Sequence, residues 1–304
     1  MIIQTKPCRQ SFAPVLLSTD LILDEIMFSN FRKSTFRLFA LGIFLLALVC
    51  LPGMEARAGQ DGIEVFAHRG LAYEQPENSL AAIKAAMDLG LDGCEVDLRT
   101  TRDHVLVLMH DPTLERTTTG RGRVKEKTYA ELCEFKLKDK KGRATGLAIP
   151  SLEQALTLVK KKKGFRLALD MKDCDPKALG QAVLQAGAQK RVIFSISGEA
   201  KTIQARALKD LNRNLFVSFD LGTWWKIEGI PTFAAQSLGA EALFCAEWNF
   251  PKYGFREAKD AGVQVIVFLW GTKDLAKRAK RAFLLGADII SCDCPGDILF
   301  LRKE

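Results

Sequence analysis

Short β-branched and apolar runs alternate along the chain, from Glu64 onward, with longer stretches whose apolar residues recur at helical spacing. The short runs end in polar or glycine-containing turns, which is typical of a parallel sheet covered by helices. Eight strands are expected, at Glu64–His68, Gly93–Leu98, Arg166–Met171, Arg191–Ile196, Leu215–Phe219, Ala242–Ala246, Gln264–Leu269 and Asp288–Ser291. Because a closed (β/α)8 barrel requires eight strands, the pattern predicts a TIM barrel.

Helical periodicity fills most of the intervals between these strands. One of the expected helices starts behind Ser151-x-x-Gln154, the pattern of a capping box. The expected helices are Ser79–Leu89, Ser151–Lys162, Pro176–Gln185, Glu199–Leu211, Lys252–Ala261 and Lys273–Leu285.

One apolar run, at 105–110, follows the second strand with no room for a helix between them. We therefore expect it to return antiparallel to that strand. A two-residue turn at 102–103 would set Glu95 opposite His110, with Asp97 two residues along on the same face. A slip of one residue would place His110 on the other side.

The segment 112–149 contains no expected barrel strand and is rich in Thr, Lys, Arg and Gly. It is interpreted as a short insertion after the second strand, at the end of the barrel where the strands finish. There it would act as a small cap over a site.

The N-terminal part has the pattern of a secretory signal. Basic residues at 32–37 precede an uncharged apolar run, Leu38–Leu51, and an A-x-A cleavage pattern ends at Ala58. The run has 14 residues, fewer than the roughly 20 that span a bilayer, which favours cleavage before Gly59 over a retained anchor. The preceding segment is long and carries acidic residues, so Met27 is an alternative start of translation.

The expected organisation is thus an N-terminal extension with a signal over 1–58 and one barrel domain over 59–304. Such a protein would be exported, to the periplasm or outside the cell. Composition agrees with a globular domain: 48% of the residues are hydrophobic and 26% charged, which excludes a disordered chain, collagen or a coiled coil. The net charge of +8 suits an anionic ligand. The basic runs are scattered without a reading motif, so nucleic-acid binding is not expected.

Acidic side chains gather where the predicted barrel carries its active site, at the carboxyl ends of the strands. Glu95 and Asp97 share one face of the second strand, and Asp170 ends the third. Their oxygens suit one divalent cation, Mg²⁺ or Ca²⁺. The alternative is that these acids pair with Arg69 and Lys172 as ion pairs of the barrel core.

The same strand ends supply groups suited to a phosphate ester. Arg69 can bind a phosphate through two parallel hydrogen bonds, and Lys172 can act as a point charge. His68 and His110 could then serve as acid and base, although two satisfied core histidines would look the same in sequence. The third histidine, His104, is interpreted as a turn residue.

These residues occur within a series of motifs that resembles the glycerophosphodiester phosphodiesterase family. The match is dense over residues 65–124 and extends over nearly the whole chain after the signal. The motifs are Ala67-His68-Arg69-Gly70, Pro76-Glu77-Asn78-Ser79, Glu95-Val96-Asp97, Thr101-x-Asp103, His110-Asp111, Arg116-Thr117-Thr118, Ile149-Pro150-Ser151-Leu152, Leu169-Asp170-Met171-Lys172 and Asp293-Cys294-Pro295. Several linked motifs in the same order are more specific than any one of them.

The resemblance implies a TIM barrel with a short insertion and metal-dependent hydrolysis of deacylated phospholipids to sn-glycerol 3-phosphate and an alcohol. By the same resemblance, the acid/base pair is His68 and His110, the metal ligands are Glu95, Asp97 and Asp170, and the phosphate-binding residues are Arg69 and Lys172. The glycerol 2-hydroxyl of the substrate would attack phosphorus, and water would then open the cyclic phosphate.

Two positions depart from the family pattern. Asp170 stands where the family usually has Glu, one methylene longer, which affects how that ligand reaches the ion. Phe268-Leu269, followed by Trp270, stands where a Trp-Thr pair is usual, so the wall against the glycerol or the alcohol is expected to differ.

Two other functions fit part of the sequence. A lysophospholipase D-like enzyme would act on lipid substrates during transient contact with a membrane surface, with Trp224, Trp225 and Phe250 as an interfacial rim. A non-catalytic barrel that binds phosphodiesters is suggested only by Asp170.

Overall fold

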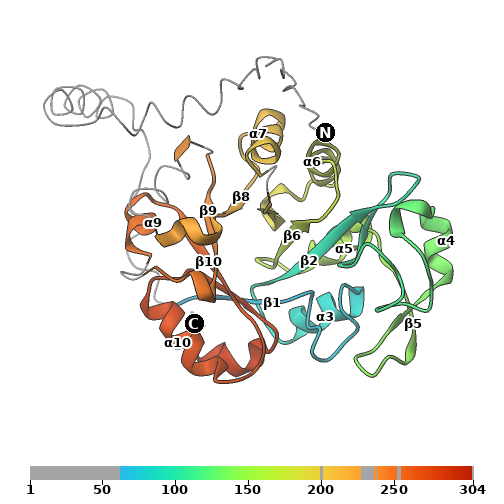
Figure 1. The fold of residues 1–304 in the computed structure, drawn as a ribbon, viewed down its shortest axis with the longest axis horizontal. Coiled ribbons are helices and arrows are strands. Elements are labelled where there is room, and N and C mark those ends of the chain that lie inside the picture. The colour runs from blue at the N-terminus through green and yellow to red at the C-terminus, as the bar shows by residue number, and fades with distance from the viewer. Residues whose placement is uncertain (1–61, 199–200, 227–235, 238, 252–254, 303–304) are drawn as a thin grey trace, which may run out of the picture. The chain divides into compact units, whose positions relative to one another are not determined.

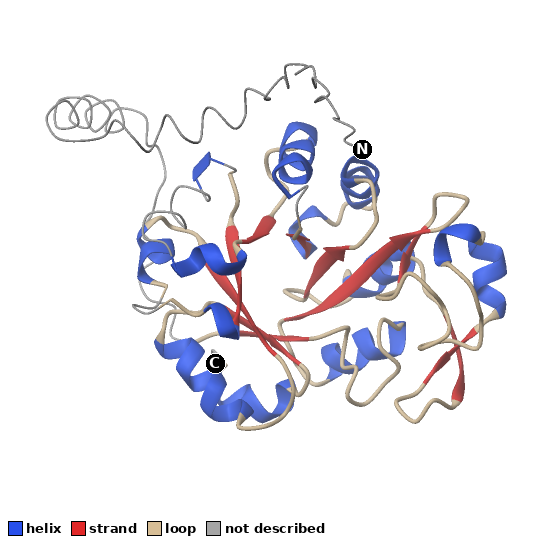
Figure 2. Ribbon diagram, in the orientation of Figure 1, coloured by secondary structure: helices blue, strands red, loops and turns tan. Residues whose placement is uncertain are grey.

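In the computed structural model, eight parallel strands close into a barrel surrounded by helices (Figures 1 and 2). The structure describes residues 62–198, 201–226, 236–237, 239–251 and 255–302. The barrel order is β1-β11-β10-β9-β8-β7-β6-β2, and pairing of β1 with β2 closes it. The strands are β1 (Glu64–Ala67), β2 (Gly93–Thr100), β6 (Arg166–Met171), β7 (Val192–Ile196), β8 (Val217–Asp220), β9 (Ala242–Ala246), β10 (Gln264–Leu269) and β11 (Ile289–Cys292). The predicted TIM barrel is confirmed.

Helices pack on the outside of the barrel. The α-helices of the barrel are α3 (Leu80–Asp88), α5 (Leu152–Val159), α6 (Pro176–Gln185), α7 (Lys201–Leu211), α9 (Arg256–Asp260) and α10 (Leu275–Leu284). Of these, α3, α5 and α6 start with side-chain caps. Ser79 and Asp175 each accept a hydrogen bond from a backbone N–H of the first turn, and the Ser151–Gln154 capping box is formed. Short 3-10 helices are η2 (Gln189–Arg191), η3 (Gly222–Lys226), η4 (Glu247–Asn249) and η5 (Pro295–Leu301).

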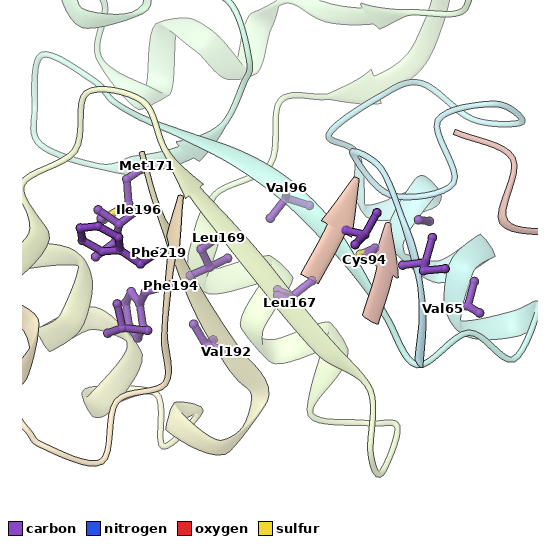
Figure 3. Close-up of a cluster of buried hydrophobic side chains, with 14 of the residues drawn as sticks. Val65, Cys94, Val96, Leu167, Leu169, Met171, Val192, Phe194, Ile196 and Phe219 are labelled. Carbon is purple, nitrogen blue, oxygen red and sulfur yellow. The ribbon is translucent and has the colours of Figure 1, made fainter. Parts of the chain in front are cut away.

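The strands carry two apolar faces because successive side chains point in opposite directions. One face packs under the helices, and Figure 3 shows part of this outer core. Its labelled side chains are Val65, Cys94, Val96, Leu167, Leu169, Met171, Val192, Phe194, Ile196 and Phe219. The other face fills the barrel interior with a separate cluster of Phe66, Ala168, Ile193, Ala242, Ile266 and Ile289. Continuous apolar strands are typical of a sheet that is buried on both sides.

The inward face becomes polar at the carboxyl ends of the strands. Two residues beyond Phe66 on β1 lies His68, and two residues beyond Ala168 on β6 lies Asp170. Glu95 and Asp97 occupy the same face of β2. The alternation that builds the apolar interior therefore also places the candidate chemistry at the barrel mouth.

The return strand is present as β3 (Leu106–Leu108), antiparallel to β2, but its register was predicted wrongly. Leu98 pairs with Leu108, one residue away from the expected alignment. The turn holds three residues, and His104 is in the left-handed conformation with φ of 62°. A three-residue turn of this kind adds one residue to the connection and shifts every pair.

The insertion has its own small core. It contains η1 (Val124–Glu126), α4 (Tyr129–Glu134) and the antiparallel pair β4 (Lys136–Lys138) and β5 (Ala144–Ala148), at the right of Figure 1. Buried side chains from the return strand and the insertion form one cluster: Val107, Met109, Leu114, Val124, Leu132, Leu137 and Ile149. The insertion is thus a packed lobe beside β3.

The predicted signal lies outside the described residues. Among the described residues, no helix combines the length and the apolar character needed to cross a membrane. Six cysteines are free there, and burial raises the pKa of the Cys174 and Cys292 thiols to about 12. These two thiols are therefore protonated near neutral pH.

Gly93 provides a stability test of the barrel interior. A Cβ at this position would lie 2.5 Å from both the Phe66 ring and the Arg166 carbonyl oxygen. We expect Gly93→Ala to lower the free energy of unfolding by about 1–3 kcal/mol, because overpacking forces the neighbours to move. The measurement is urea unfolding monitored by circular dichroism.

Gly146→Ala is the matched control, since no atom lies within 4 Å of a Cβ there. It should change the free energy of unfolding by no more than about 0.5 kcal/mol. Equal stability of the two variants would mean that the interior tolerates the extra methyl group.

Candidate active site

His68 follows β1 directly and is held by a carboxylate at the end of the neighbouring strand β11. Its Nδ1 lies 2.8 Å from Asp293 Oδ1, in the residue after β11, and its Nε2 lies 3.8 Å from Glu95 Oε2. The hydrogen bond with His68 lowers the pKa of Asp293. With Nδ1 bonded to Asp293, the ring presents Nε2 to the acidic residues of β2.

Arg69 lies in a tight turn that wraps around Glu95. Its φ is 54° and that of Gly70 is 72°, both in the left-handed region. The Arg69 backbone N–H donates to Glu95 Oε2 at 2.9 Å, and the Gly70 N–H donates to the Glu95 carbonyl at the same distance. A Cβ on Gly70 would lie 2.6 Å from Ala82 Cβ, so helix α3 packs against this turn only because residue 70 is glycine.

Glu95, Asp97 and Asp170 converge as expected. One carboxylate oxygen of each lies within 4.8 Å of those of the other two. Asp97 is 1% exposed, and it accepts hydrogen bonds at its side chain from Asn78 Nδ2 at 2.7 Å and from Lys172 Nζ at 3.0 Å. This is the only group of three or more such potential ligands among the described residues.

The two buried carboxylates of β2 titrate in opposite directions. Burial raises the pKa of Glu95 well above its ordinary value, and the charges of Asp97 and Asp170 raise it further. Burial alone would also raise the pKa of Asp97, but Lys172 and the Asn78 hydrogen bond outweigh it and lower that pKa. Glu95 is therefore the member of the cluster that most lacks a compensating positive charge.

Lys172 supplies the ion pairs that were considered as an alternative to a metal. Its Nζ lies 2.7 Å from Asp170 Oδ2 and 3.0 Å from Asp97 Oδ1. Burial would lower the pKa of Lys172, but the charges of Asp170 and Asp97 raise it. Arg69 Nε lies 3.4 Å from Asp97 Oδ2. These contacts account for Asp97 and Asp170, whereas among the described residues the basic side chain in contact with Glu95 is His68.

His110 lies two residues beyond the end of β3, so the strand alternation does not determine its direction. Its Nδ1 lies 2.7 Å from Asp111 Oδ1, and Arg99 donates two hydrogen bonds to its carbonyl oxygen. The N–H of Met109, the residue before His110, donates to the Asp97 carbonyl at 2.9 Å, so His110 follows directly on a residue bonded to the acidic strand β2. The wrong register therefore did not remove His110 from the site.

Arg116, the first arginine of the insertion, connects the two sides of the site. Its guanidinium binds both carboxylate oxygens of Asp111 and both of Glu77. Glu77 in turn accepts from Arg69 Nη1 at 2.9 Å. A continuous chain of hydrogen bonds thus runs from His110 through Arg116 to Arg69.

This chain strongly perturbs its carboxylates. The Arg116 hydrogen bond and the contact with His110 hold the pKa of Asp111 well below its ordinary value. For Glu77, burial acts to raise the pKa, but Arg116 and Arg69 outweigh it and lower it. Both carboxylates are therefore ionised near neutral pH.

Aromatic rings line the opposite side of the mouth. Phe268, at the position where the family pattern has Trp, packs edge-on against His68 with ring centroids 4.4 Å apart. Of the three residues proposed as an interfacial rim, Trp225 is excluded because it is 3% exposed, whereas Phe250 is partly exposed and packs on Phe255. The side chain of Trp224 lies outside the described set.

Five residues of this network had no assigned role in the sequence analysis: Glu77, Asn78, Asp111, Arg116 and Asp293. All five lie within quoted motifs, and the His-Asp dipeptide at 110–111 was a direct signal of an oriented histidine. The four others come from distant loops, so that their contacts depend on the tertiary fold. The roles assigned to the seven candidate residues stay predictions.

Comparisons with known proteins agree with this architecture. Residues 68–297 match the glycerophosphoryl diester phosphodiesterase family. A glycerophosphodiester phosphodiesterase of Caldanaerobacter subterraneus is 38% identical over 249 residues, which cover 79% of this chain and 98% of that protein. One of the same description from Bacillus altitudinis is 38% identical over 111 residues, covering 36% of this chain and 45% of that protein.

Solved structures show the same fold. A glycerophosphoryl diester phosphodiesterase from Parabacteroides distasonis has a TM-score of 0.66 at 25% identity, covering 81% of this chain and 88% of that one. A phosphodiesterase from Oleispira antarctica, solved with the product sn-glycerol-3-phosphate, has a TM-score of 0.66 at 22% identity, covering 79% of this chain and 96% of that one. The chain belongs to the glycerophosphoryl diester phosphodiesterase family, as its motifs predicted, and is an enzyme of that class.

The Arg116 contacts make folding stability depend on pH. The pKa of Asp111 is lower in the folded protein than the ordinary value of about 3.9, so the unfolded chain binds more protons between the two values. The stabilisation is present above about pH 4 and is lost as the pH falls below it. We expect Arg116→Gln to be less stable at neutral pH and to lose less stability than the parent protein between about pH 5 and pH 3.

Urea unfolding at several pH values measures this difference. Arg123→Gln is the control, because Arg123 lies in the same insertion and its Nε is 4.0 Å from Glu126. If the stabilities of the parent and Arg116→Gln changed with pH in the same way, Arg116 would not be the cause of the lowered Asp111 pKa.

Proposed function

We propose that the protein hydrolyses glycerophosphodiesters to sn-glycerol 3-phosphate and an alcohol, using one divalent cation and two histidines. The observation that carries the proposal is that His68 and His110 are each bonded through Nδ1 to a carboxylate at the barrel end that carries the acidic cluster. Nε2 of His68 lies 3.8 Å from Glu95, and Met109, next to His110, donates to the Asp97 carbonyl. Membership of the phosphodiesterase family supports the reaction class.

The residues at the mouth fit a hard cation such as Mg²⁺ or Ca²⁺. Glu95, Asp97 and Asp170 offer three carboxylate oxygens within reach of one ion, and among the described residues the basic side chain paired with Glu95 is a histidine. Proteins do not ordinarily bury a carboxylate without compensation. When bound, such a cation would supply positive charge that polarises the phosphoryl oxygens.

Arg69 and Lys172 are proposed to bind the phosphate oxygens. Both lie next to Asp97, so that a phosphate within their reach would also adjoin the carboxylates. Glu77 fixes the Arg69 guanidinium from its outer side at Nη1. Lys172 would exchange part of its contact with Asp97 and Asp170 for the substrate, since an ammonium can rotate among several acceptors.

The two histidines are proposed to move protons in two steps. One Nε2 removes the proton of the glycerol 2-hydroxyl, whose oxygen forms a bond to phosphorus, while the other histidine protonates the alcohol oxygen as its bond to phosphorus breaks. Water then opens the cyclic phosphate with the two roles exchanged. Asp293 and Asp111 hold the rings so that Nδ1 stays protonated in both steps.

Loss of either the cation or a histidine should stop the reaction. We expect chelation to abolish release of glycerol 3-phosphate from glycerophosphocholine and a restored divalent cation to recover it. His110→Ala should lower kcat by about 100-fold or more, because general acid–base catalysis contributes about 10²–10⁴. The measurement is a coupled glycerol 3-phosphate assay on residues 59–304.

His104→Asn is the control for His110→Ala, because His104 lies in the turn of the β2–β3 hairpin and Asn tolerates its left-handed conformation. Binding of Mg²⁺, Ca²⁺ and Mn²⁺ to the parent protein and to Asp170→Asn and Asp170→Glu is measured separately by calorimetry. A folded protein that binds phosphodiesters without turnover under any metal would favour a non-catalytic barrel. Turnover of lysophosphatidylcholine alone would favour the lipid-active alternative.

We also propose that the protein is exported and cleaved before Gly59, because the basic segment, the apolar run and the A-x-A pattern occur in the order of a signal peptide. The mature protein from a bacterial expression host should then begin with Gly-Gln-Asp. N-terminal sequencing of the fraction released from the periplasm checks this. A chain found there that still carries Leu38–Leu51 would contradict cleavage.

A further inference from the structure

A row of aromatic rings leads from His68 out of the barrel mouth. The centroid of the Phe268 ring lies 4.4 Å from that of the His68 ring and 4.0 Å from that of the Trp270 ring. The Trp270 ring in turn stacks on Trp248, with centroids 4.4 Å apart and planes inclined by 25°. The four rings thus form one continuous series that begins at a candidate catalytic residue.

The series changes from buried to exposed along its length. Phe268 is 4% exposed, Trp270 is 40% exposed and Trp248 is 63% exposed. Trp270 directly follows β10, and Trp248 lies in η4, directly after the neighbouring strand β9. The outer two rings therefore form a solvent-facing wall at the end of the barrel that carries the acidic cluster.

Polar contacts hold this wall in place without covering it. Arg278 donates to the Trp270 carbonyl at 2.7 Å and to both carboxylate oxygens of Glu247, the residue before Trp248. The Gly271 N–H donates to Asp293 Oδ2 at 2.8 Å, and Asp293 also bonds His68. The backbone after Trp270 is thus fixed to Asp293, the carboxylate that also bonds His68, and Arg278 links the Trp270 carbonyl to the residue before Trp248.

The charges around the wall favour a cation over an anion. The Arg278 guanidinium is neutralised by Glu247, and Asp293 adds a further carboxylate nearby. Exposed indole faces attract organic cations through their negative π-faces, and quaternary ammonium groups are bound in this way.

No exposed apolar side chain that could extend the wall for an acyl chain comes from β9, η4 or β10 among the described residues other than Trp248 and Trp270. The remaining large exposed apolar side chains among the described residues belong to other elements and loops: Tyr73, Leu89, Ile203, Phe283, Leu284 and Phe300. Tyr73, in the β1–α3 loop, has Lys140 over its ring at 3.6 Å. A compact cationic group matches two stacked rings better than a long chain does.

We infer that Trp248 and Trp270 form a subsite for the alcohol half of the substrate and select alcohols that carry a quaternary ammonium group, such as choline. The inference rests on the proposed function, because it places the phosphate beside His68 and the acidic cluster. The alcohol then lies along Phe268 toward the stacked indoles, and its positive charge contacts the exposed ring faces.

Substrate competition tests the inference. We expect the ratio of kcat/KM for glycerophosphocholine to that for glycerophosphoglycerol to fall by roughly 3- to 30-fold in the Trp248→Ala/Trp270→Ala double variant. Trp248→Phe should keep most of the ratio, since it keeps an aromatic face. Phe300→Ala is the control for removal of an exposed aromatic ring on another element.

A binding measurement separates this inference from the proposed reaction. Two ligands are titrated into the cation-loaded protein by calorimetry, which requires no turnover. They are phosphocholine and 3,3-dimethylbutyl phosphate, in which an uncharged tert-butyl group replaces the trimethylammonium group. Tighter binding of phosphocholine, lost in the double variant, supports the subsite even if no diester is hydrolysed. Equal binding of the two ligands would overturn it.

Two kinetic outcomes would also overturn the inference. One is an equal loss of activity on both diesters in the double variant, which would mean a general structural role for the rings. The other is selective loss of activity on lysophosphatidylcholine, which would mean that the wall contacts an acyl chain.

Discussion

The site depends on one constraint, which is that the negative charge of the buried Asp97 carboxylate must be compensated. That carboxylate is 1% exposed, so that water cannot solvate it, and a buried charge of this kind requires partners. Asn78 supplies one from the turn before α3, Lys172 another from the end of β6. Arg69 completes the set from a left-handed turn that also binds Glu95. The loop after β1 is thus shaped by the acids of β2, and that loop carries Arg69, one of the two residues proposed to bind phosphate.

The period-two alternation of the strands was sufficient to predict that His68 and the three acidic residues meet at the mouth. Once Phe66 and Ala168 face the interior, His68 and Asp170 must follow them on the same side. The alternation failed at the β2–β3 hairpin because the left-handed conformation of His104 is a property of the backbone that no apolar pattern encodes. It could not place Arg116 either, since the insertion lacks a regular period and packs as a separate lobe. Fold and acidic cluster were therefore predictable, whereas the contacts that orient the histidines were not.

The insertion supplies Arg116, which contacts residues of the site. The Arg116 guanidinium donates hydrogen bonds to the carboxylates of Asp111 and Glu77. Asp111 in turn bonds His110, and Glu77 bonds Arg69. A planar guanidinium fixes both partners in direction as well as distance, which an ammonium does not. The spacing between a candidate acid/base residue and a candidate phosphate ligand thus depends on how the lobe docks on β3.

The mouth of the barrel is chemically divided. Carboxylates and basic side chains lie at the ends of β1, β2 and β6. Aromatic rings lie at the ends of β9 and β10, on the other side of β11. A phosphodiester is divided in the same way, because one charged phosphate joins two groups that differ in polarity. His68 and Asp293 stand at the boundary, bonded to each other and in contact with both parts. The proton-transfer role proposed for His68 would put it beside the bond between phosphorus and a substituent, which is the bond that hydrolysis must break.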